Sequence, residues 1–183
     1  MTLRIHPKTL MLTSMKYSGF TLVELVITVT IMTILLSLAA VSLTSTLANQ
    51  RDAERASDIN TIANNLENYY KVGNGGSTTN RYPSTALLAS GATSIKSFFP
   101  RADIDTFTAP DTASVSVSFI PATNAVATVA GVTPQPTKSQ FVYQPIQNNG
   151  TLCTAESQEC RRFNLFYRTE IDNTVKKFIS KHQ

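Results

Sequence analysis

The fold of this chain is decided by the sequence GFTLVELVITVTIMTILLSLAAVSLTSTLANQ, residues 19–50. Within it, Leu25–Gln50 is an uninterrupted run of 26 residues without a charged side chain. As an α-helix with a rise of about 1.5 Å per residue, that run would be about 39 Å long. Because the hydrocarbon core of a bilayer is about 30 Å thick, the sequence predicts a helix that can cross a membrane.

The charges on either side of this run predict its orientation. Residues 1–19 contain no acid and three basic residues: Arg4, Lys8 and Lys16. After the run, two basic and two acidic residues cancel: Arg51, Asp52, Glu54 and Arg55. Since positively charged flanks stay on the cytoplasmic side, we expect the N-terminus inside the cell and the residues beyond position 50 outside it.

A carboxylate, Glu24, stands at the start of the apolar segment. Such a group in a membrane-spanning segment costs on the order of 2.5–3.5 kcal/mol at the bilayer centre. Two simple interpretations leave it unexplained: a plain single-span anchor, and a secretory signal peptide cut near Ala40-Val41-Ser42. Because an ionisable residue in a membrane segment usually has a function, Glu24 is the first candidate functional residue.

The residues around Glu24 also carry a family resemblance. The sequence GFTLVE, residues 19–24, has basic residues before it and an apolar run after it. It resembles the class III signal sequence of type IV pilins and type II secretion pseudopilins. The resemblance implies that a prepilin peptidase cuts between Gly19 and Phe20 and methylates the new Phe20 amine. It also implies that Glu24 pairs with the N-terminal amine of a neighbouring subunit. A further implied partner is an inner-membrane assembly platform.

The resemblance divides the chain into four parts. Residues 1–19 would be a leader that is removed, and 20–50 a transmembrane helix used for assembly. Residues 51–72 would continue that helix, and 73–183 would form an exported head. Met15-Lys16-Tyr17-Ser18-Gly19 is by itself a short leader of the kind this family uses. Translation could therefore start at Met15 or Met11 instead of Met1.

Beyond residue 50 the helix is predicted to be amphipathic. Apolar residues recur at helical spacing along one face: Ala56, Ile59, Ala63, Leu66 and Tyr70, flanked by Ile62 and Tyr69. Glu67 and Lys71 have the i,i+4 spacing of a surface ion pair. The sequence Gly73-Asn74-Gly75-Gly76 favours a helix end near Lys71. We expect the apolar stripe to pack on the protein's own sheet, and a helix over about 20–72 to measure about 80 Å.

Residues 51–83 carry a second resemblance, to the segment that leaves the membrane in G-type pseudopilins and related bacterial pilins. The shared features are Arg51-Asp52 at the start of the soluble helix, the pair Tyr69-Tyr70 at its end, and Tyr82-Pro83 after a Gly/Asn loop. This match is independent of the first and implies the same class of exported subunit.

The rest of the chain predicts a small α+β head. Residues 84–110 have the composition of short helical turns and loops, and 121–124 that of a turn. Four short stretches have strand patterns: 115–119, 125–130, 141–143 and 163–167. Three or four short antiparallel strands are enough to cover one face of the helix. The predicted fold is therefore α+β and type IV pilin-like, a long N-terminal helix packed on a small antiparallel sheet.

Cys153 and Cys160 are the two cysteines of the chain. In an exported domain they can form a disulfide, and closing so short a loop would add roughly 2–3 kcal/mol of stability on the chain-entropy model. Two free thiols are the alternative. Many pilins carry a C-terminal disulfide loop, so the resemblance favours pairing.

The composition argues against several other functions. The two histidines of the chain, His6 and His182, lie near its ends. The body of the chain therefore has no Ser-His-Asp or Cys-His arrangement and no histidine-ligated zinc site. Asp103, Asp105 and Asp111 lack the spacing of a calcium-binding loop. We expect no catalytic residue, no metal and no cofactor.

Positive charge is concentrated at the C-terminus. Residues 161–183 contain two acids, Glu170 and Asp172, and six basic residues: Arg161, Arg162, Arg168, Lys176, Lys177 and Lys181. One hypothesis is that this edge binds extracellular DNA, with an affinity that falls steeply as salt rises. We favour the interpretation that the basic edge of one subunit contacts the acidic remainder of its neighbour.

These features together predict a structural subunit of a type IV pilus or a pilus-like filament. It would span the inner membrane once before assembly and lie in an extracellular or periplasmic filament afterwards. The expected partners are prepilin peptidase, other copies of itself or related pilins, the assembly platform and membrane lipid. The alternatives are a pseudopilin of a type II secretion system and a membrane-anchored exported binding protein that never polymerises.

Overall fold

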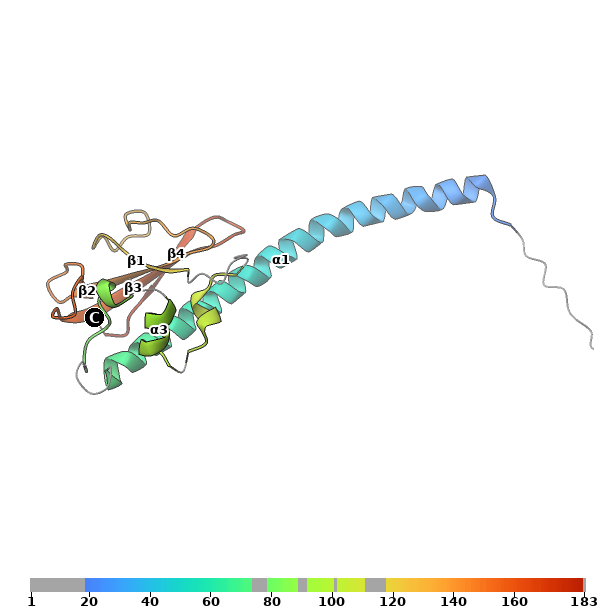
Figure 1. Cartoon of the computed structure of the whole chain (residues 1–183). Helices are drawn as coiled ribbons and strands as arrows, with labels where there is room; N and C mark the ends of the chain where they lie inside the picture. The colour runs from blue at the N-terminus through green and yellow to red at the C-terminus, as the bar shows by residue number, and fades with distance from the viewer. Residues whose placement is uncertain (1–18, 74–78, 89–91, 101, 111–117, 183) are drawn as a thin grey trace, which may run out of the picture. The chain divides into compact units, whose positions relative to one another are not determined.

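A computed structural model describes residues 19–73, 79–88, 92–100, 102–110 and 118–182 (Figure 1). The chain divides into two compact units, Met1–Ser42 and Leu43–Gln183. The first unit contains the beginning of helix α1, and the second contains the rest of that helix together with the sheet. The observed class, a long apolar N-terminal helix with a small sheet, is the predicted α+β fold.

Helix α1 spans Leu22–Val72 and ends where the glycine signal predicted. Gly73 has a φ of 69°, in the left-handed region that a residue without a side chain adopts most easily. Its N–H donates to the Tyr69 carbonyl at 2.7 Å, which satisfies one of the free carbonyls of the last turn. The predicted helix end is therefore confirmed.

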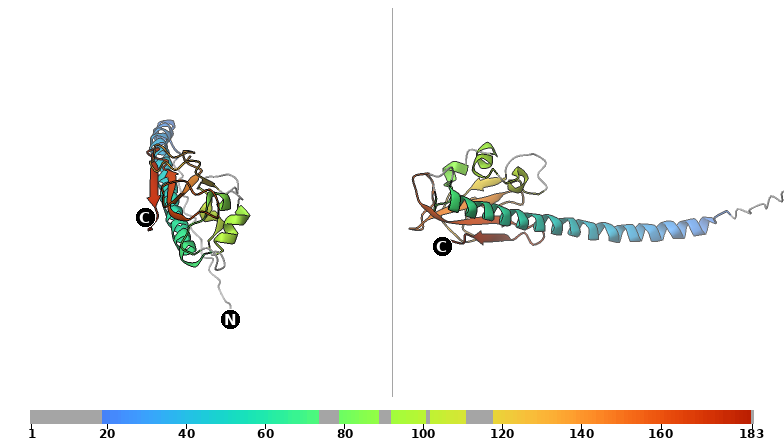
Figure 2. Two further views of the ribbon diagram at one scale, coloured as in Figure 1. Left: turned by 90° about the vertical axis from the view of Figure 1, so that its left-hand side faces the viewer. Right: turned by 90° about the horizontal axis from the view of Figure 1, so that it is seen from below.

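The amphipathic part of α1 supplies one side of the main core. Its buried apolar residues follow the predicted stripe: Ile59, Ile62, Ala63, Leu66 and Tyr69. They belong to one cluster with Phe141, Tyr143 and Phe163 of the sheet, and Figure 2 shows this part of α1 lying along one face of the sheet. The predicted packing of the stripe on the protein's own sheet is confirmed.

The sheet contains four strands in the order β1-β2-β3-β4. These are β1 (Phe119–Pro121), β2 (Phe141–Gln147), β3 (Cys160–Arg168) and β4 (Val175–Ile179). The pairs β2–β3 and β3–β4 are antiparallel, whereas β1 and β2 are parallel, with Ile120 opposite Val142. The sheet is therefore mixed, and not wholly antiparallel as expected.

The parallel pair arises because residues 122–140 cross over the sheet instead of turning back beside β1. A parallel pair requires a crossover of this kind. The strand expected at 125–130 does not form, since Gln144 of β2 donates to the carbonyls of Asn124 and Val126 and fixes this segment as a loop. Residues 115–117 of another expected strand lie outside the described part of the chain.

Side chains of the sheet alternate between two apolar clusters. The inner face contributes Phe141, Tyr143 and Leu165 to the main core. The outer face carries Val142 and Phe166, which pack under the crossover residues Ala122 and Val132. The crossover therefore covers part of the face that α1 leaves free.

Three short helices border the main core: α2 (Thr85–Leu88), α3 (Ala92–Phe98) and the 3-10 helix η1 (Ile104–Phe107). They confirm the short helical turns expected in this part of the chain. Leu88 and Phe107 are buried, and Phe99, which follows α3, stacks on the Phe107 ring at 5.6 Å between centroids.

Candidate functional site

The first unit begins with a capped helix. Thr21 precedes α1, and its carbonyl accepts the Leu25 N–H at 3.1 Å. The Thr21 hydroxyl accepts the Glu24 N–H at 3.2 Å, the bond that an N-cap threonine makes. Glu24 therefore lies in the first turn, where the helix dipole favours a negative charge.

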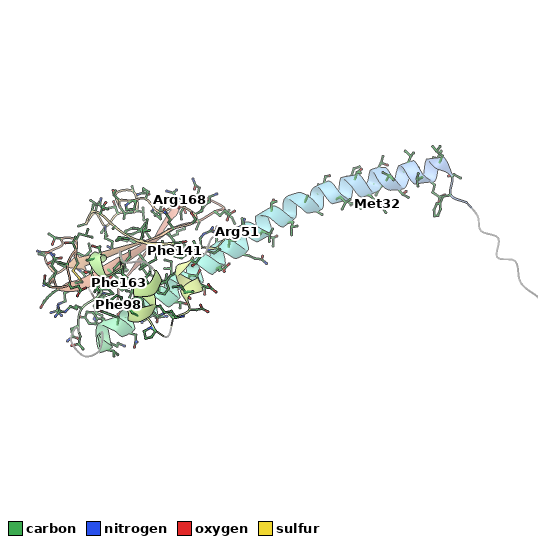
Figure 3. All side chains as sticks on the ribbon, in the orientation of Figure 1. Met32, Arg51, Phe98, Phe141, Phe163 and Arg168 are labelled. Atoms are coloured by element: carbon green, nitrogen blue, oxygen red, sulfur yellow. A yellow bond between two sulfur atoms is a disulfide. The ribbon has the colours of Figure 1, made fainter. Side chains whose placement is uncertain are left out.

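The side chains of the first turns of α1 are exposed on every side. The exposed fraction is 81% for Phe20, 78% for Leu22 and 62% for Met32. Figure 3 shows the Met32 side chain and its neighbours projecting from the helix uncovered. A contiguous apolar surface of this kind marks a site of protein or membrane contact. By length and composition, α1 contains one segment able to cross a membrane.

The hydroxyl groups in this apolar segment are satisfied within the helix itself. Four of them donate to carbonyls three or four residues earlier at 2.8–2.9 Å: Thr28, Thr30, Thr33 and Ser37. Polar groups with internal partners can enter lipid at reduced cost. The charge of Glu24 is different, because its carboxylate contacts no cation among the residues that the structure describes.

A comparison with known families addresses this segment directly. Residues 14–40 match the prokaryotic N-terminal methylation motif. The chain therefore carries a type IV pilin-like prepilin leader. The match includes Gly19, Phe20 and Glu24, and it points to a structural, pilin-like protein rather than an enzyme. Comparisons with curated proteins and with solved structures give no match.

The methylation motif, residues 14–40, overlaps the beginning of helix α1 over residues 22–40. The motif ends at residue 40, inside the segment of α1 that is long and apolar enough to span a bilayer. Together they indicate a prepilin leader followed by a membrane anchor. The cleavage position, the methylated amine and the partner of Glu24 are expectations from the sequence.

In the second unit, Cys153 and Cys160 form the disulfide that the sequence analysis favoured. Their Cα atoms are 5.6 Å apart and both residues are buried. The carbonyls of the two cysteines accept backbone N–H groups of Thr85 and Tyr82, respectively. The disulfide loop thus also holds the segment that follows α1.

The charged residues at the beginning of the soluble part of α1 form a site that the sequence analysis did not recognise. Arg51 donates two hydrogen bonds to Glu170, and Asp52 accepts the backbone N–H of Glu170 at 2.7 Å. Arg55, with 2% of its surface exposed, contacts Asp52 at 2.9 Å and Glu170 at 3.5 Å. Hydrogen bonding from Arg51 lowers the pKa of Glu170 to about 2. These four residues, the Arg51–Glu170 cluster, join α1 to the β3–β4 turn.

Glu67 does not pair with Lys71 as its spacing suggested. Its side chain is buried, with 5% exposed, and accepts the Tyr82 hydroxyl at 3.0 Å. Its Oε1 atom accepts the Lys181 N–H at 2.8 Å, and His182 Nε2 lies 3.5 Å from the Oε2 atom that Tyr82 contacts. Tertiary packing overrides the local helical pair, and Glu67 fastens the C-terminal residues to α1.

The six basic residues of the C-terminus have different partners in the structure. Arg161 pairs with Glu159 at 2.8 Å, and Lys176 with Asp172 at 3.6 Å. Arg168 donates to backbone carbonyls of Pro136 and Asn173, and Lys181 is exposed. Arg162 and Lys177 line a common cavity.

Proposed function

We propose that this protein is a structural subunit of a type IV pilus or a pilus-like filament. It is made as a precursor with leader 1–19 and cut by a prepilin peptidase between Gly19 and Phe20. The new Phe20 amine is N-methylated. The helix over 20–50 then polymerises, 51–72 extends it, and 73–183 forms the exported head.

One observation carries the proposal: the methylation motif overlaps an exposed apolar segment of α1, residues 22–50, in which Glu24 is the one carboxylate. A plain anchor needs the apolar residues and has no use for Glu24. In a filament, the apolar side chains exchange lipid for neighbouring helices. Helix association in such surroundings depends on close packing and on polar contacts between helices.

The role of Glu24 follows from electrostatics. Leaving water for a bundle of apolar helices is expensive for an isolated carboxylate, and much less so for a paired one. Cleavage after Gly19 creates a free amine at Phe20, only four positions before Glu24. We propose that Glu24 of one subunit pairs with the Phe20 amine of its neighbour, which sets the axial step between adjacent subunits.

The location of each part follows from the same chemistry. Before assembly, the apolar helix anchors the subunit in the inner membrane, with its N-terminus in the cytoplasm and its head outside. An inner-membrane assembly platform then transfers it to the filament. The Cys153–Cys160 disulfide supports an exported head, because disulfides persist mainly in oxidising compartments.

A second candidate is a pseudopilin of a type II secretion system. The resemblance of residues 51–83 to G-type pseudopilins favours it. Two of the shared residues, Tyr70 and Tyr82, are in ring contact at 4.7 Å between centroids. This candidate uses the same processing and the same assembly helix, so the two differ only in the machine that the filament serves.

Sequencing the mature N-terminus tests the proposal. We expect N-methyl-phenylalanine at Phe20, and we expect a Gly19→Val variant to retain its leader. A mature chain that begins near Leu43 would show signal-peptide cleavage, and a chain with its leader intact would show a plain anchor. Either result would exclude the filament subunit. Imaging of shed filaments with labelled subunits then separates an abundant pilin from a pseudopilin.

A further inference from the structure

A cavity on the outer face of the sheet contains two cations without an acidic partner. Its volume is about 300 Å³, and it lies between the crossover and strands β3 and β4. Arg162 of β3 and Lys177 of β4 both line it. Among the described residues, neither side chain has a carboxylate within salt-bridge distance. A volume of this size is at the lower end for small-molecule sites.

Arg162 has a buried donor that nothing in the described structure satisfies. Its Nη2 atom donates to the Gln147 carbonyl at 3.4 Å, a long hydrogen bond. Its Nε atom is buried and has no hydrogen-bond partner. That atom has less than 1 Å² of accessible surface, so an anion in the cavity would contact the guanidinium through its terminal nitrogens. For a guanidinium, the complementary group is an oxyanion.

Lys177 supplies the second charge. Its Nζ atom donates to the Ala127 carbonyl at 3.0 Å, which uses one of its three protons. That bond holds the ammonium beside the crossover, at the wall of the cavity. A carbonyl contact leaves the positive charge uncompensated, and a carboxylate is the stronger partner.

The strand register places the two cations on either side of an uncharged centre. Asn164 pairs with Ile179, and Lys177 stands opposite Phe166. Arg162 therefore lies two residues to one side of the Asn164–Ile179 pair, and Lys177 two residues to the other. At about 3.3 Å per residue, their backbones are roughly 13 Å apart along the strands. Apolar side chains, Ile146 and Ile179, line the cavity together with the cations.

We propose that this cavity binds a small organic anion with two acidic groups, such as a short dicarboxylate. One acidic group pairs with the terminal nitrogens of the Arg162 guanidinium, and the other pairs with Lys177. The carbon chain between them lies over Asn164 and Ile179. The site lies wholly within Leu43–Gln183, so it does not depend on filament assembly.

The test is a titration of the full chain in non-ionic detergent with succinate, glutarate and adipate at constant ionic strength. We expect a saturable shift of the Arg162 Nε–H signal in nitrogen–proton NMR spectra, and a rise in the melting temperature with ligand. Propionate, which has one acidic group, should bind at least about tenfold more weakly, because one charge-assisted contact is missing.

Neighbouring residues provide matched controls. Arg162→Gln and Lys177→Gln should each weaken binding of the best dicarboxylate at least about tenfold. Arg161→Gln and Lys176→Gln remove the same charge one position away, where each side chain already has an acidic partner. These two variants should bind the dicarboxylate within about twofold of the wild type, because they change the overall surface charge and not the groups that line the cavity.

Three results would overturn the proposal. The first is the absence of a saturable shift of the Arg162 signal with any of the dicarboxylates. The second is an equal loss of binding in the pocket variants and the control variants. The third is a defect in subunit association in Arg162→Gln and Lys177→Gln while the wild type binds no dicarboxylate, which would make the cavity a subunit contact. The wild-type titration keeps the test valid if Arg162→Gln fails to fold.

Discussion

The Arg51 guanidinium donates two hydrogen bonds to the Glu170 carboxylate, from Nη2 to Oε1 at 2.5 Å and from Nε to Oε2 at 2.8 Å. The two residues are 119 positions apart in the sequence. Figure 3 labels Arg51 on α1, in the part of the helix that lies beside the sheet. A paired guanidinium and carboxylate fix direction as well as distance, so this contact orients the β3–β4 turn on the helix.

Glu170→Gln should destabilise the second unit by roughly 1–3 kcal/mol at pH 7. The buried Arg55 guanidinium then loses one of its two carboxylate partners, Glu170, and keeps Asp52. The pKa of Glu170 is lowered from its ordinary 4.5 to about 2 in the folded protein, chiefly by the hydrogen bond from Arg51. Its stabilisation is therefore complete above pH 4.5 and disappears as the pH falls towards 2. Unfolding of wild type and variant should converge over that range. Glu156→Gln removes an exposed carboxylate that forms no ion pair among the described residues, and it should show no such convergence.

Asp58→Asn should have the opposite pH dependence. Burial, with a smaller contribution from Glu54, raises the pKa of Asp58 to about 7. The folded protein thus holds this proton more tightly than the unfolded chain, and stability falls as the pH rises from about 4 to 7. The variant should equal the wild type near pH 4 and exceed it near pH 8 in chemical unfolding. An advantage that is constant across pH would contradict this assignment.

Glu67→Ala should release the C-terminal residues from α1. The substitution leaves the Tyr82 hydroxyl and the Lys181 N–H without their acceptor, at a cost of roughly 1–3 kcal/mol. Hydrogen exchange at the Lys181 amide should accelerate. The exposed carboxylate Glu156 offers the control, since Glu156→Ala should leave that exchange rate unchanged. Equal rates in the two variants would show that Glu67 does not hold the tail.

Removal of the disulfide by Cys153→Ser together with Cys160→Ser should lower stability by roughly 2–3 kcal/mol. The loop also fixes Tyr82 and Thr85 through backbone hydrogen bonds. Amide exchange at these two residues should therefore rise along with the loss of overall stability. The reduced wild type should unfold at the same temperature as the double variant. A large difference between them would show that the serine side chains themselves destabilise the fold.

Glu24→Ala should be processed normally and assemble poorly. The cleavage site is unchanged, so mass spectrometry should still find methylated Phe20. Filament yield should fall, because the Phe20 amine of the neighbour loses its counter-charge. Thr33→Val on the same helix is the control, since the Thr33 hydroxyl bonds only to the Thr30 carbonyl of its own helix. Normal filaments from Glu24→Ala would remove the pairing role.

The structure of the N-terminal third can be predicted from the sequence, because the patterns that decide it are local. A charge-free run such as Leu25–Gln50, the sequence around Glu24 and the glycine after Val72 each act within a few turns of helix. The apolar stripe was nearly as informative, since helical spacing alone places Ile59, Ala63 and Leu66 on one face. These patterns do not require knowledge of any distant residue.

For the head, residues 73–183, the sequence predicts the fold class and two of the strands correctly. The stretches 141–143 and 163–167 lie inside β2 and β3, because apolar alternation marks a half-buried strand. The pattern at 125–130 is misleading, since the Val126 carbonyl accepts a hydrogen bond from the Gln144 side chain instead of from a neighbouring strand. Strand β4 is not among the expected strands because Lys176 and Lys177 interrupt its apolar pattern and indicate a basic edge, although Phe178 packs against the core.

The prepilin leader, the membrane-competent helix and its amphipathic continuation can be predicted without a structure, because hydrophobicity and helical period are properties of adjacent residues. Which charges meet depends on the folded chain. Arg51 and Glu170 come together across most of the chain, and Arg162 and Lys177 come to share one cavity. Such pairs depend on strand register and on the path of the crossover, and both are set by the packing of the whole core.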